Sequence, residues 1–307
     1  MCLPTSGVIW LGFPKQPCEE EGLRVEDGAE EKRTVHTGRV ETVERLTPGM
    51  IRIVLGGEGL SAFDTRGHTD SYVKLLFPPP SETDPDSYDL DAVRAERPRS
   101  EWPVTRTYTV RTWDRVNRLL TLDFVYHGDK GLAGPWAAAT RPGDRLRLLG
   151  PGGGYAPSPD ADWHLLAGDE SALPAIAAAL EHLPEGAPAH VFIEISGPEE
   201  EQPLTVREGV QVHWLHRGTG KVGSALVPAV RALDFPEGAV HAFVHGEAGA
   251  VKELRRLLRI DHNLPKEQLS ISGYWRLGRD EDRWQSGKAE WNRSVEAEEE
   301  AALKARR

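Results

Sequence analysis

The sequence predicts a two-domain protein: an antiparallel six-stranded β-barrel, then a parallel-sheet α/β domain with a C-terminal helix. Three observations predict this fold class. The length of 307 residues suits about two domains. Short strand-like segments fill the first half, whereas strands alternate with helical segments in the second half. A glycine-rich run at 150–154 marks the change between the two textures.

The barrel is predicted from six segments in which apolar residues alternate or cluster as they do in strands. These segments are 36–46, 50–55, 72–77, 104–112, 119–127 and 145–149. We expect a long surface loop at 78–99, which is rich in Pro, Asp and Ser, and one helix at 135–140. Six short strands with turns between them favour a closed or nearly closed barrel.

The second half alternates strands with helices, which predicts right-handed βαβ units and a parallel sheet. The expected strands are 163–167, 189–195, 210–215, 240–245 and 269–275, and the expected helices are 172–183, 222–233 and 248–259. The domain organisation that we expect is a flexible leader at 1–33, a barrel at 34–155, an α/β domain at 156–279 and a helical tail at 280–307. The tail is either a lid or partner helix, or a solvated helix packed on the surface.

Composition excludes several classes of protein. The net charge of -11 argues against a nucleic-acid partner. The two cysteines, Cys2 and Cys18, are too few for an ordinary iron–sulfur cluster, and the histidines show no metal-ligand spacing, so we expect no resident metal. No apolar run approaches the ~20 residues that span a bilayer, and no signal peptide is recognisable. We expect a cytoplasmic monomer with no membrane partner.

A first motif lies on the predicted strand 104–112, at residues 106–111. Alternation places Arg106 and Tyr108 on one face and Thr109 on the other. A guanidinium suits a diphosphate, a Tyr ring can pack on a flat heterocycle, and a Thr hydroxyl can bond the edge of that ring. The alternative is an ordinary exposed strand.

A second motif follows on the next strand, where His127 precedes a glycine-rich turn and a helix at 131–137. Glycines allow close backbone approach, and a helix N-terminus after such a turn is an anion site. The strand and turn together therefore predict contacts to a nucleotide and its phosphates. By itself His127 is equally compatible with a satisfied or exposed histidine.

A third motif, 168–176, reads as a strand end, a sharp turn and a helix. Doubly wound domains bind cofactor phosphates at this position, but the turn is not GxGxxG. Glu247 comes just after the expected strand 240–245, and Trp275 ends the expected strand 269–275; both strands should end at the same edge. The alternatives are a plain turn with Asp169 or Ser171 as helix cap, and aromatic packing at the sheet edge.

Together these motifs cover roughly 35 to 285 and resemble, in order, the siderophore-interacting protein family of FAD-dependent ferric-siderophore reductases, in the ferredoxin-reductase-like superfamily. The resemblance implies FAD on the barrel and a nicotinamide cofactor on the α/β domain. The candidate cofactor residues are Arg106, Tyr108, Thr109, Asp123, Val125, His127, Gly131, Ala133, Gly134 and Trp136 on the barrel, and Asp169, Glu170, Ser171, Glu247 and Trp275 on the α/β domain. The turn departs from the usual Gly-Pro-Ala-Ser of the family, because Gly131-Leu132-Ala133 precedes Gly134-Pro135.

The cofactors would carry the chemistry, so we assign no side chain to catalysis itself. NADH is favoured over NADPH, because the stretch 196–202 is acidic and would repel a 2′-phosphate unless Arg207 compensates. The expected substrate is a ferric siderophore, bound by a positive patch of Lys130, Arg276 and Arg279, with Arg283 nearby. The alternative is that these are solvated side chains. Two other functions remain open, a flavin reductase with another acceptor and a non-catalytic siderophore-binding protein.

Overall fold

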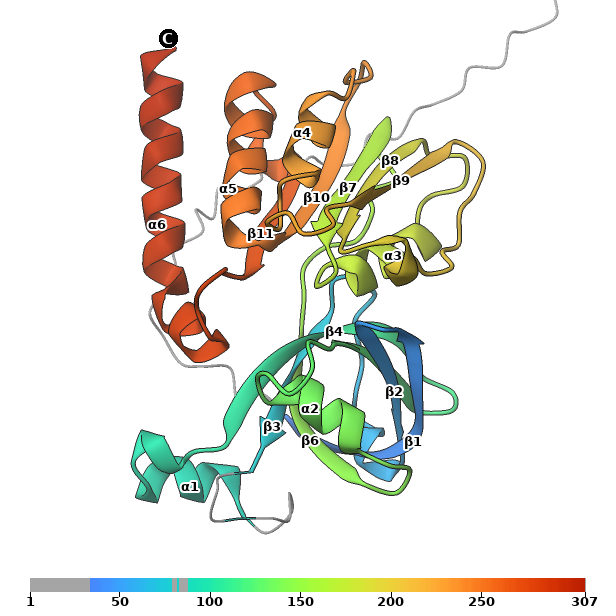
Figure 1. Ribbon diagram of the computed structural model, residues 1–307, viewed down its shortest axis with the longest axis vertical. Coiled ribbons are helices and arrows are strands. Elements are labelled where there is room, and N and C mark those ends of the chain that lie inside the picture. The colour runs from blue at the N-terminus through green and yellow to red at the C-terminus, as the bar shows by residue number, and fades with distance from the viewer. Residues whose placement is uncertain (1–33, 79–81, 83–87, 307) are drawn as a thin grey trace, which may run out of the picture. The chain divides into compact units, whose positions relative to one another are not determined.

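A computed structural model of the protein describes residues 34–78, 82 and 88–306. The leader expected at 1–33, which contains both cysteines, lies outside the described residues. The described chain forms a β-barrel followed by an α/β domain and a C-terminal helix, which confirms the predicted fold class (Figure 1).

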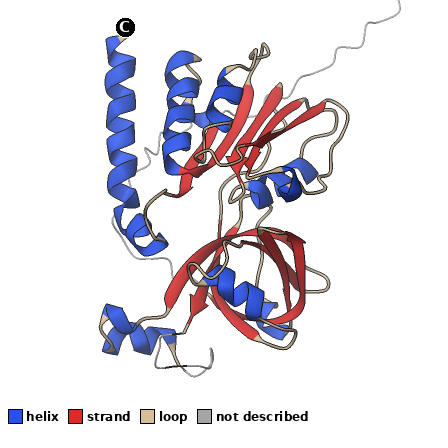
Figure 2. Cartoon of the chain, viewed as in Figure 1, coloured by secondary structure: helices blue, strands red, loops and turns tan. Residues whose placement is uncertain are grey.

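Six antiparallel strands close the barrel in the order β1-β2-β5-β4-β3-β6. Figure 2 draws the strands in red. They are β1 (Val35–Thr47), β2 (Met50–Gly56), β3 (Tyr72–Phe77), β4 (Val104–Asp114), β5 (Leu119–Val125) and β6 (Arg145–Gly152). A short 3-10 helix, η1 (Glu58–Leu60), follows β2. Each of the six predicted barrel strands is therefore present.

Alternating apolar side chains build the core of the barrel. Ile53 and Leu55 of β2 are fully buried and pack with Val73 and Leu75 of β3. Full burial of one such side chain contributes about 1.5–3 kcal/mol, so this cluster is a main source of stability for the barrel. Helix α2 (Ala133–Ala139) packs against β2 and β5 and adds its buried alanines to the same cluster.

The prediction of a loop at 78–99 is wrong for the second half of that segment. This half contains helix α1 (Leu90–Glu96), and the 3-10 helix η2 (Arg99–Glu101) begins at its end. Asp89 caps α1 by accepting a hydrogen bond from Ala92 N at 2.8 Å. Only Leu90 and Val93 of this helix are buried, next to β3 and β6. Two apolar residues in a charged segment are too few to give a visible helical period.

The α/β domain has a parallel sheet of five strands in the order β11-β10-β7-β8-β9. Its strands are β7 (Trp163–Asp169), β8 (Ala189–Ile195), β9 (Val210–His216), β10 (Val240–Glu247) and β11 (Leu269–Trp275). Its helical segments are α3 (Leu173–Glu181), η3 (Pro198–Glu200), α4 (Leu226–Arg231), α5 (Ala248–Arg256) with the π-helical turn η4 (Leu257–Asp261), and η5 (Lys266–Gln268). Helix α3 packs on one face of the sheet, and α4 and α5 pack on the other (Figure 1). Because the five strands are parallel, they all end at one edge of the sheet, which is called the carboxyl edge below.

Helix α4 is shorter than the helix predicted at 222–233. Glu194, fully buried in β8, accepts hydrogen bonds from the backbone N–H groups of Gly223, Ala225 and Leu226. The carboxylate thus binds the donors at the start of the helix and determines where it begins.

The predicted tail forms a long helix, α6 (Glu281–Ala305), whose N-cap is Asp280. Glu299 accepts hydrogen bonds from Arg255 of α5 and Arg259 of η4, at 2.6 and 2.7 Å. Near its start Trp284 is only 1% exposed and donates from Nε1 to the carbonyl of Tyr274 at 3.0 Å. Both ends of the helix are therefore attached to the α/β domain.

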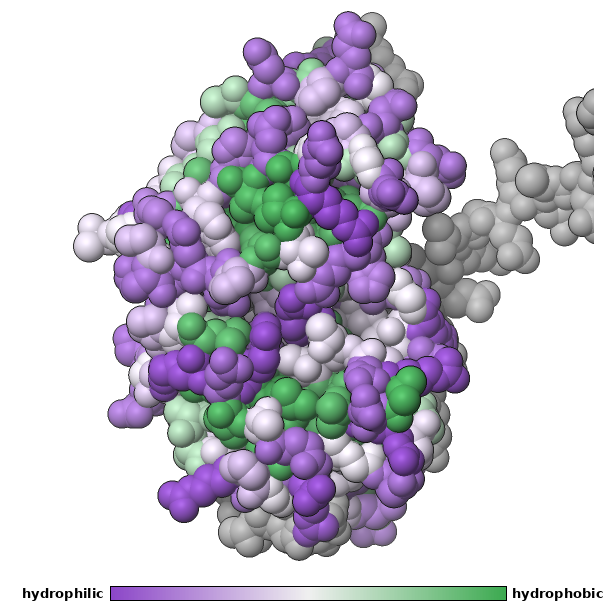
Figure 3. All heavy atoms as spheres, turned by 90° about the vertical axis from the view of Figure 1, so that its right-hand side faces the viewer, coloured by the Kyte–Doolittle hydropathy of each residue, from purple (hydrophilic) through white to green (hydrophobic). Residues whose placement is uncertain are grey.

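One face of the molecule is mostly hydrophilic, with apolar residues in separate patches (Figure 3). Among the described residues, the large apolar side chains that are clearly exposed are Val116, Val206 and Leu277. Within the same ranges, no helix combines the length and the hydropathy needed to cross a bilayer. The part of the chain covered by the structure also contains no cluster of metal-binding side chains.

Candidate functional site

Strands β4 and β5 part halfway along β4, and this opening is where the first motif lies. Val104 to Thr109 pair with β3, whereas only Val110 to Asp114 pair with β5. Strand β5 instead continues its pairing with β2. The edge of β4 that carries residues 106–109, called the flavin motif below, is therefore open to partners from outside the barrel.

Two carboxylates from the first turn of α6 bind this open edge. Arg106 donates from Nη1 and Nη2 to the two carboxylate oxygens of Asp282, each at 3.2 Å. The backbone N–H of Thr107 donates to Glu281 Oε1 at 2.9 Å, and Glu281 Oε2 lies 3.8 Å from Arg106 Nε. A guanidinium and a backbone N–H thus already form an anion-binding pair of donors.

Tyr108 lies next to the barrel core. Its ring centroid is 4.4 Å from that of Phe124, and the centroid of Trp136 is 5.7 Å from Phe124 on β5. Burial, reinforced by the charge of Glu281, raises the pKa of the Tyr108 hydroxyl. Tyr108 and Trp136 therefore contact the same buried ring, although they are far apart in the sequence.

The predicted turn leads into α2 as expected. Gly128 and Gly131 have positive φ values of 70° and 81°, which glycine adopts without strain. The N-cap residue Leu132 makes no side-chain capping bond. A Cβ on Gly134 would lie 3.2 Å from the carbonyl oxygen of Val125, so a larger residue would push the helix away from β5.

The donors on the barrel suit a flavin nucleotide. The guanidinium of Arg106 and the N–H of Thr107 already bind carboxylate oxygens, which resemble phosphate oxygens in charge. The second motif adds a glycine-rich turn and the start of helix α2, which has no side-chain cap. Tyr108 adds an aromatic ring. The residues present therefore fit FAD.

Four predicted residues of the α/β domain form one hydrogen-bond network at the carboxyl edge. Asp169, 1% exposed, accepts hydrogen bonds from Ser171 N and Oγ at 2.9 and 2.5 Å. It also accepts from Glu247 N at 2.7 Å and from Trp275 Nε1 at 2.9 Å. Burial raises the pKa of the Asp169 carboxyl, while these hydrogen bonds act in the opposite direction.

Glu247 has a structural task in addition. Its side chain accepts hydrogen bonds from Gly249 N and Ala250 N and so caps α5. It also accepts from Leu277 N at 3.1 Å, after the end of β11. The network therefore ties the ends of β7, β10 and β11 together. In doubly wound domains nucleotides bind at this edge of the sheet.

The fifth predicted residue of this domain, Glu170, stands apart from the network. It forms an ion pair with Arg217, which follows β9, at 2.6 Å. Burial raises the pKa of the Glu170 carboxyl, against the effect of the Arg217 guanidinium. The sequence analysis missed Arg217, although it lies two residues after the predicted strand 210–215, just as Glu247 lies two residues after the predicted strand 240–245.

The acidic stretch 196–202 is occupied by contacts within the protein. Glu200 accepts hydrogen bonds from the Thr47 hydroxyl and from Gly49 N, in the turn between β1 and β2. Glu201 accepts from His216 at 2.8 Å. His127, in the turn after β5, senses the charges of this region. Burial and the charge of Arg217 lower the pKa of His127, and the charge of Glu200 raises it.

The residues of the predicted cationic patch come from two segments of the chain. Arg276 is half-buried and Arg279 is exposed, both directly after β11, and Lys130 is exposed in the turn after β5. Arg283 lies 3.5 Å from Asp280 at the start of α6. Lys130 thus lies on a different segment of the chain from Arg276 and Arg279. The two arginines after β11 therefore remain the candidate substrate contacts that share one segment.

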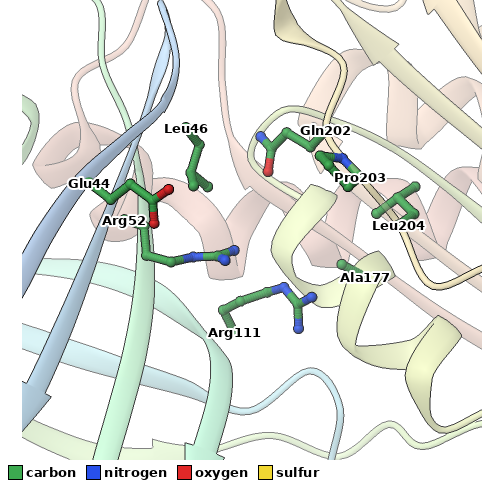
Figure 4. Close-up of a pocket in the computed structure, with 8 residues that line it drawn as sticks. All are labelled: Glu44, Leu46, Arg52, Arg111, Ala177, Gln202, Pro203 and Leu204. Atoms are coloured by element: carbon green, nitrogen blue, oxygen red, sulfur yellow. The ribbon is translucent and has the colours of Figure 1, made fainter.

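A separate pocket of about 360 Å³ lies between the barrel and α3 (Figure 4). It is lined by Glu44, Leu46, Arg52, Arg111, Ala177, Gln202, Pro203 and Leu204. Arg52 forms a bidentate pair with Asp123 at 2.7 and 2.8 Å, and Arg111 forms one with Glu181 at 3.0 and 2.6 Å. Both guanidinium charges are thus balanced. Asp123, a predicted cofactor residue, is held in this ion pair.

Comparison with known proteins agrees with the fold. A model of the siderophore-interacting FAD-binding domain matches residues 39–155, and a model of the siderophore-interacting protein matches 161–278. The chain belongs to the siderophore-interacting protein family and carries its FAD-binding domain.

Three relatives and one solved structure illustrate the similarity. An uncharacterised protein of Mycobacterium tuberculosis is 44% identical over 84% of this chain and 96% of its own length. The ferric vibriobactin reductase of Vibrio cholerae is 33% identical over 78% and 88%. The NADPH-dependent ferric-chelate reductase of Escherichia coli is 31% identical over 76% and 89%. A siderophore utilization protein from T. fusca superposes with a TM-score of 0.70 at 38% identity, covering 80% of this chain and 94% of that one.

Proposed function

We propose that this protein is a ferric-siderophore reductase that uses FAD and a reduced nicotinamide. FAD, when bound, would supply the link between a two-electron hydride donor and a one-electron acceptor, so that one NAD(P)H could reduce two ferric ions. Chelators with hard oxygen ligands bind Fe(III) more tightly than Fe(II), and reduction therefore frees the iron. The family membership and the names of two relatives as ferric reductases support the proposal.

One set of contacts carries the proposal. Glu281 at the start of α6 accepts a hydrogen bond from Thr107 N in the flavin motif at 2.9 Å, and Trp284 of the same helix donates to the carbonyl of Tyr274 on β11 at 3.0 Å. The next residue, Trp275, donates to Asp169 at the carboxyl edge. Hydride transfer requires two cofactor rings in contact, and this chain of contacts joins the flavin strand to the edge that suits a nicotinamide. A protein that only bound siderophores would not need this connection.

We further propose a role for each part of the chain. Residues 34–155 would hold FAD, residues 156–279 would hold the nicotinamide cofactor, and 280–307 would form a helical tail. Arg106 and the N–H of Thr107 would bind the FAD diphosphate, and Tyr108 would pack on its flavin ring. The network around Asp169 would support the nicotinamide cofactor. Arg276 and Arg279 would attract an anionic ferric chelate.

Anaerobic stopped-flow spectroscopy tests the function. The FAD-loaded protein is mixed with NADH or NADPH, and the reduced protein is then mixed with a panel of ferric chelates. We expect bleaching of the flavin absorbance by the coenzyme and reoxidation by at least one ferric siderophore. Flavin that no coenzyme reduces would support a non-catalytic binding protein instead. Reduction without reoxidation by any chelate would indicate a flavin reductase with another acceptor.

A further inference from the structure

We propose that Glu170 and Arg217 together determine the choice between NADH and NADPH, an inference that rests on the proposed function. Glu170 directly follows β7 and Arg217 directly follows β9, with β8 between these strands in the sheet. Their ion pair therefore spans the carboxyl ends of three neighbouring strands. A dinucleotide bound at the carboxyl edge would pass over this pair.

The charge of Arg217 is already engaged by carboxylates. Its Nη1 lies 2.6 Å from Glu170 and 4.0 Å from Glu194. Glu194 is fully buried and caps the start of α4, so it has no freedom to move away. Glu170 is the accessible one of the two carboxylates. Its side chain is 15% exposed, next to the Arg217 side chain, which is 12% exposed, whereas the Glu194 side chain is fully buried.

The two members of the pair have opposite preferences for the adenosine ribose. In doubly wound domains an acid near the end of the second strand accepts a hydrogen bond from the 2′-hydroxyl of NADH, whereas an arginine there binds the 2′-phosphate of NADPH. Glu170 and Arg217 flank the end of that second strand, β8. Here both types of residue occur at one place and neutralise each other. With Glu170 ionised, a 2′-hydroxyl finds an acceptor, and a 2′-phosphate meets a carboxylate next to the guanidinium that it needs.

Arg207, the other arginine considered for binding a 2′-phosphate, already forms hydrogen bonds within the protein. Arg207 donates to the carbonyl oxygens of Leu183 and Glu181, at 2.8 and 3.0 Å, and so satisfies groups at the C-terminal end of α3. Preference for NADH therefore depends on the charge of Glu170, and a neutral residue at this position would make Arg217 available to a phosphate.

Nucleotide binding tests the proposal without any turnover. Isothermal titration of the FAD-loaded protein with 5′-AMP and with 2′,5′-ADP gives two dissociation constants, whose ratio reports the preference for a 2′-phosphate. We expect the wild type to bind 5′-AMP at least as tightly as 2′,5′-ADP. In Glu170→Gln the ratio should move about tenfold toward 2′,5′-ADP, the size of one charge-assisted contact. The ratio of kcat/KM for NADPH and NADH should move in the same direction.

A matched control is Glu181→Gln, which breaks another Glu–Arg pair, between Glu181 of α3 in the α/β domain and Arg111 of β4 in the barrel, at 2.6 Å. It should leave the ratio of nucleotide affinities unchanged. In the double variant Glu170→Gln/Arg217→Gln the gain for 2′,5′-ADP should disappear. A gain that persists without Arg217 would overturn the proposal, as would an unchanged ratio in folded, FAD-containing Glu170→Gln.

The failure of this inference and the failure of the proposed function give different results. A wild type that binds neither nucleotide, and whose flavin neither coenzyme reduces, would contradict the proposed function and this inference with it. A wild type that binds both nucleotides, with no change in Glu170→Gln, would contradict only the assignment of Glu170 and Arg217.

Discussion

At the scale of single residues, Arg106 determines much of the character of the barrel site. Its side chain is partly buried and already binds two carboxylates, so it lies where anionic groups collect. The planar guanidinium can accept a diphosphate in the same bidentate manner as it accepts Asp282. Loss of this side chain should therefore be felt in cofactor binding.

We expect Arg106→Ala to weaken FAD binding by about 1.5–3 kcal/mol, a factor of roughly ten to a hundred, because one charge-assisted contact is lost. Fluorescence titration of the flavin-free protein with FAD measures the dissociation constant. Arg118→Ala is the control, since this barrel arginine pairs with the exposed Glu58 away from the flavin motif. Undiminished FAD affinity in Arg106→Ala would remove Arg106 from the site.

His245 is a second residue with a measurable signature. It is 4% exposed, stacks on Phe243 at 3.9 Å and contacts Ser270 Oγ at 3.0 Å. Burial, helped by the charge of Lys288, lowers the pKa of His245 to about 3. In the unfolded chain the pKa is about 6.5, so below that pH the unfolded state takes up a proton that the folded state refuses.

The stability of the wild type should therefore fall as the pH decreases from about 6.5, with a contribution of up to about 1.4 kcal/mol per pH unit from this residue. The variant His245→Phe lacks the titrating ring and should show a shallower fall. Urea unfolding at a series of pH values between 7 and about 4.5 compares the two slopes. Parallel curves for the two proteins would show that His245 is protonated equally in both states.

At the scale of elements, α6 joins the two regions that we propose to hold the cofactors. Its first turn binds the flavin motif, Trp284 attaches it to the strand end at Tyr274, and Glu299 attaches its far end to the region of α5. The tail is thus more than a solvated helix on the surface. Its two leading carboxylates use the donors that a diphosphate would need, so helix and cofactor should compete for the flavin motif.

Neutralising those carboxylates should favour the cofactor. In the double variant Glu281→Gln/Asp282→Asn we expect FAD to bind the flavin-free protein about tenfold more tightly, because no anion has to be displaced from Arg106. Glu290→Gln, on an exposed position of the same helix, should leave the affinity unchanged. Weaker FAD binding in the double variant would mean that the two carboxylates support the site instead of competing for it.

At the scale of the whole molecule, the net charge of -11 opposes the approach of an anionic ferric chelate. A local cluster of arginines must offset this repulsion if such a chelate is to be reduced. Arg276 and Arg279 follow β11 and stand next to the residue chain from Trp275 to Asp169. Charge over the whole surface and charge at this strand end therefore act in opposite directions.

Reduction of an anionic ferric chelate should slow as salt is added, since screening acts over about 10 Å at 0.1 M. Arg276→Glu should raise the KM for that chelate several-fold, and Arg293→Glu, exposed on α6, should change it little. Steady-state kinetics gives the KM, and stopped-flow reduction by NADH is followed separately. Equal slowing of both half-reactions would identify Arg276 as a structural residue or a contact of the nicotinamide.

Much of this protein was predictable because its signals are local. Alternating apolar residues determine the strands, and the change to strand–helix alternation predicts the second architecture. The flavin motif and the turn at 168–171 lie within single segments, so their residue types are visible in the sequence. The helix α1 escaped prediction because only two of its residues are buried.

The pairings between distant segments were decided by the tertiary structure alone. Arg106 meets Asp282 across 176 residues, and Asp169 meets Trp275 across 106. Glu170 meets Arg217 only because β7 and β9 flank the same strand. The sequence determined which groups are available at each strand end. Strand order and helix packing decide which carboxylate pairs with which guanidinium. The two groups of an ion pair must lie within a few ångströms of each other, and local sequence patterns do not specify that distance.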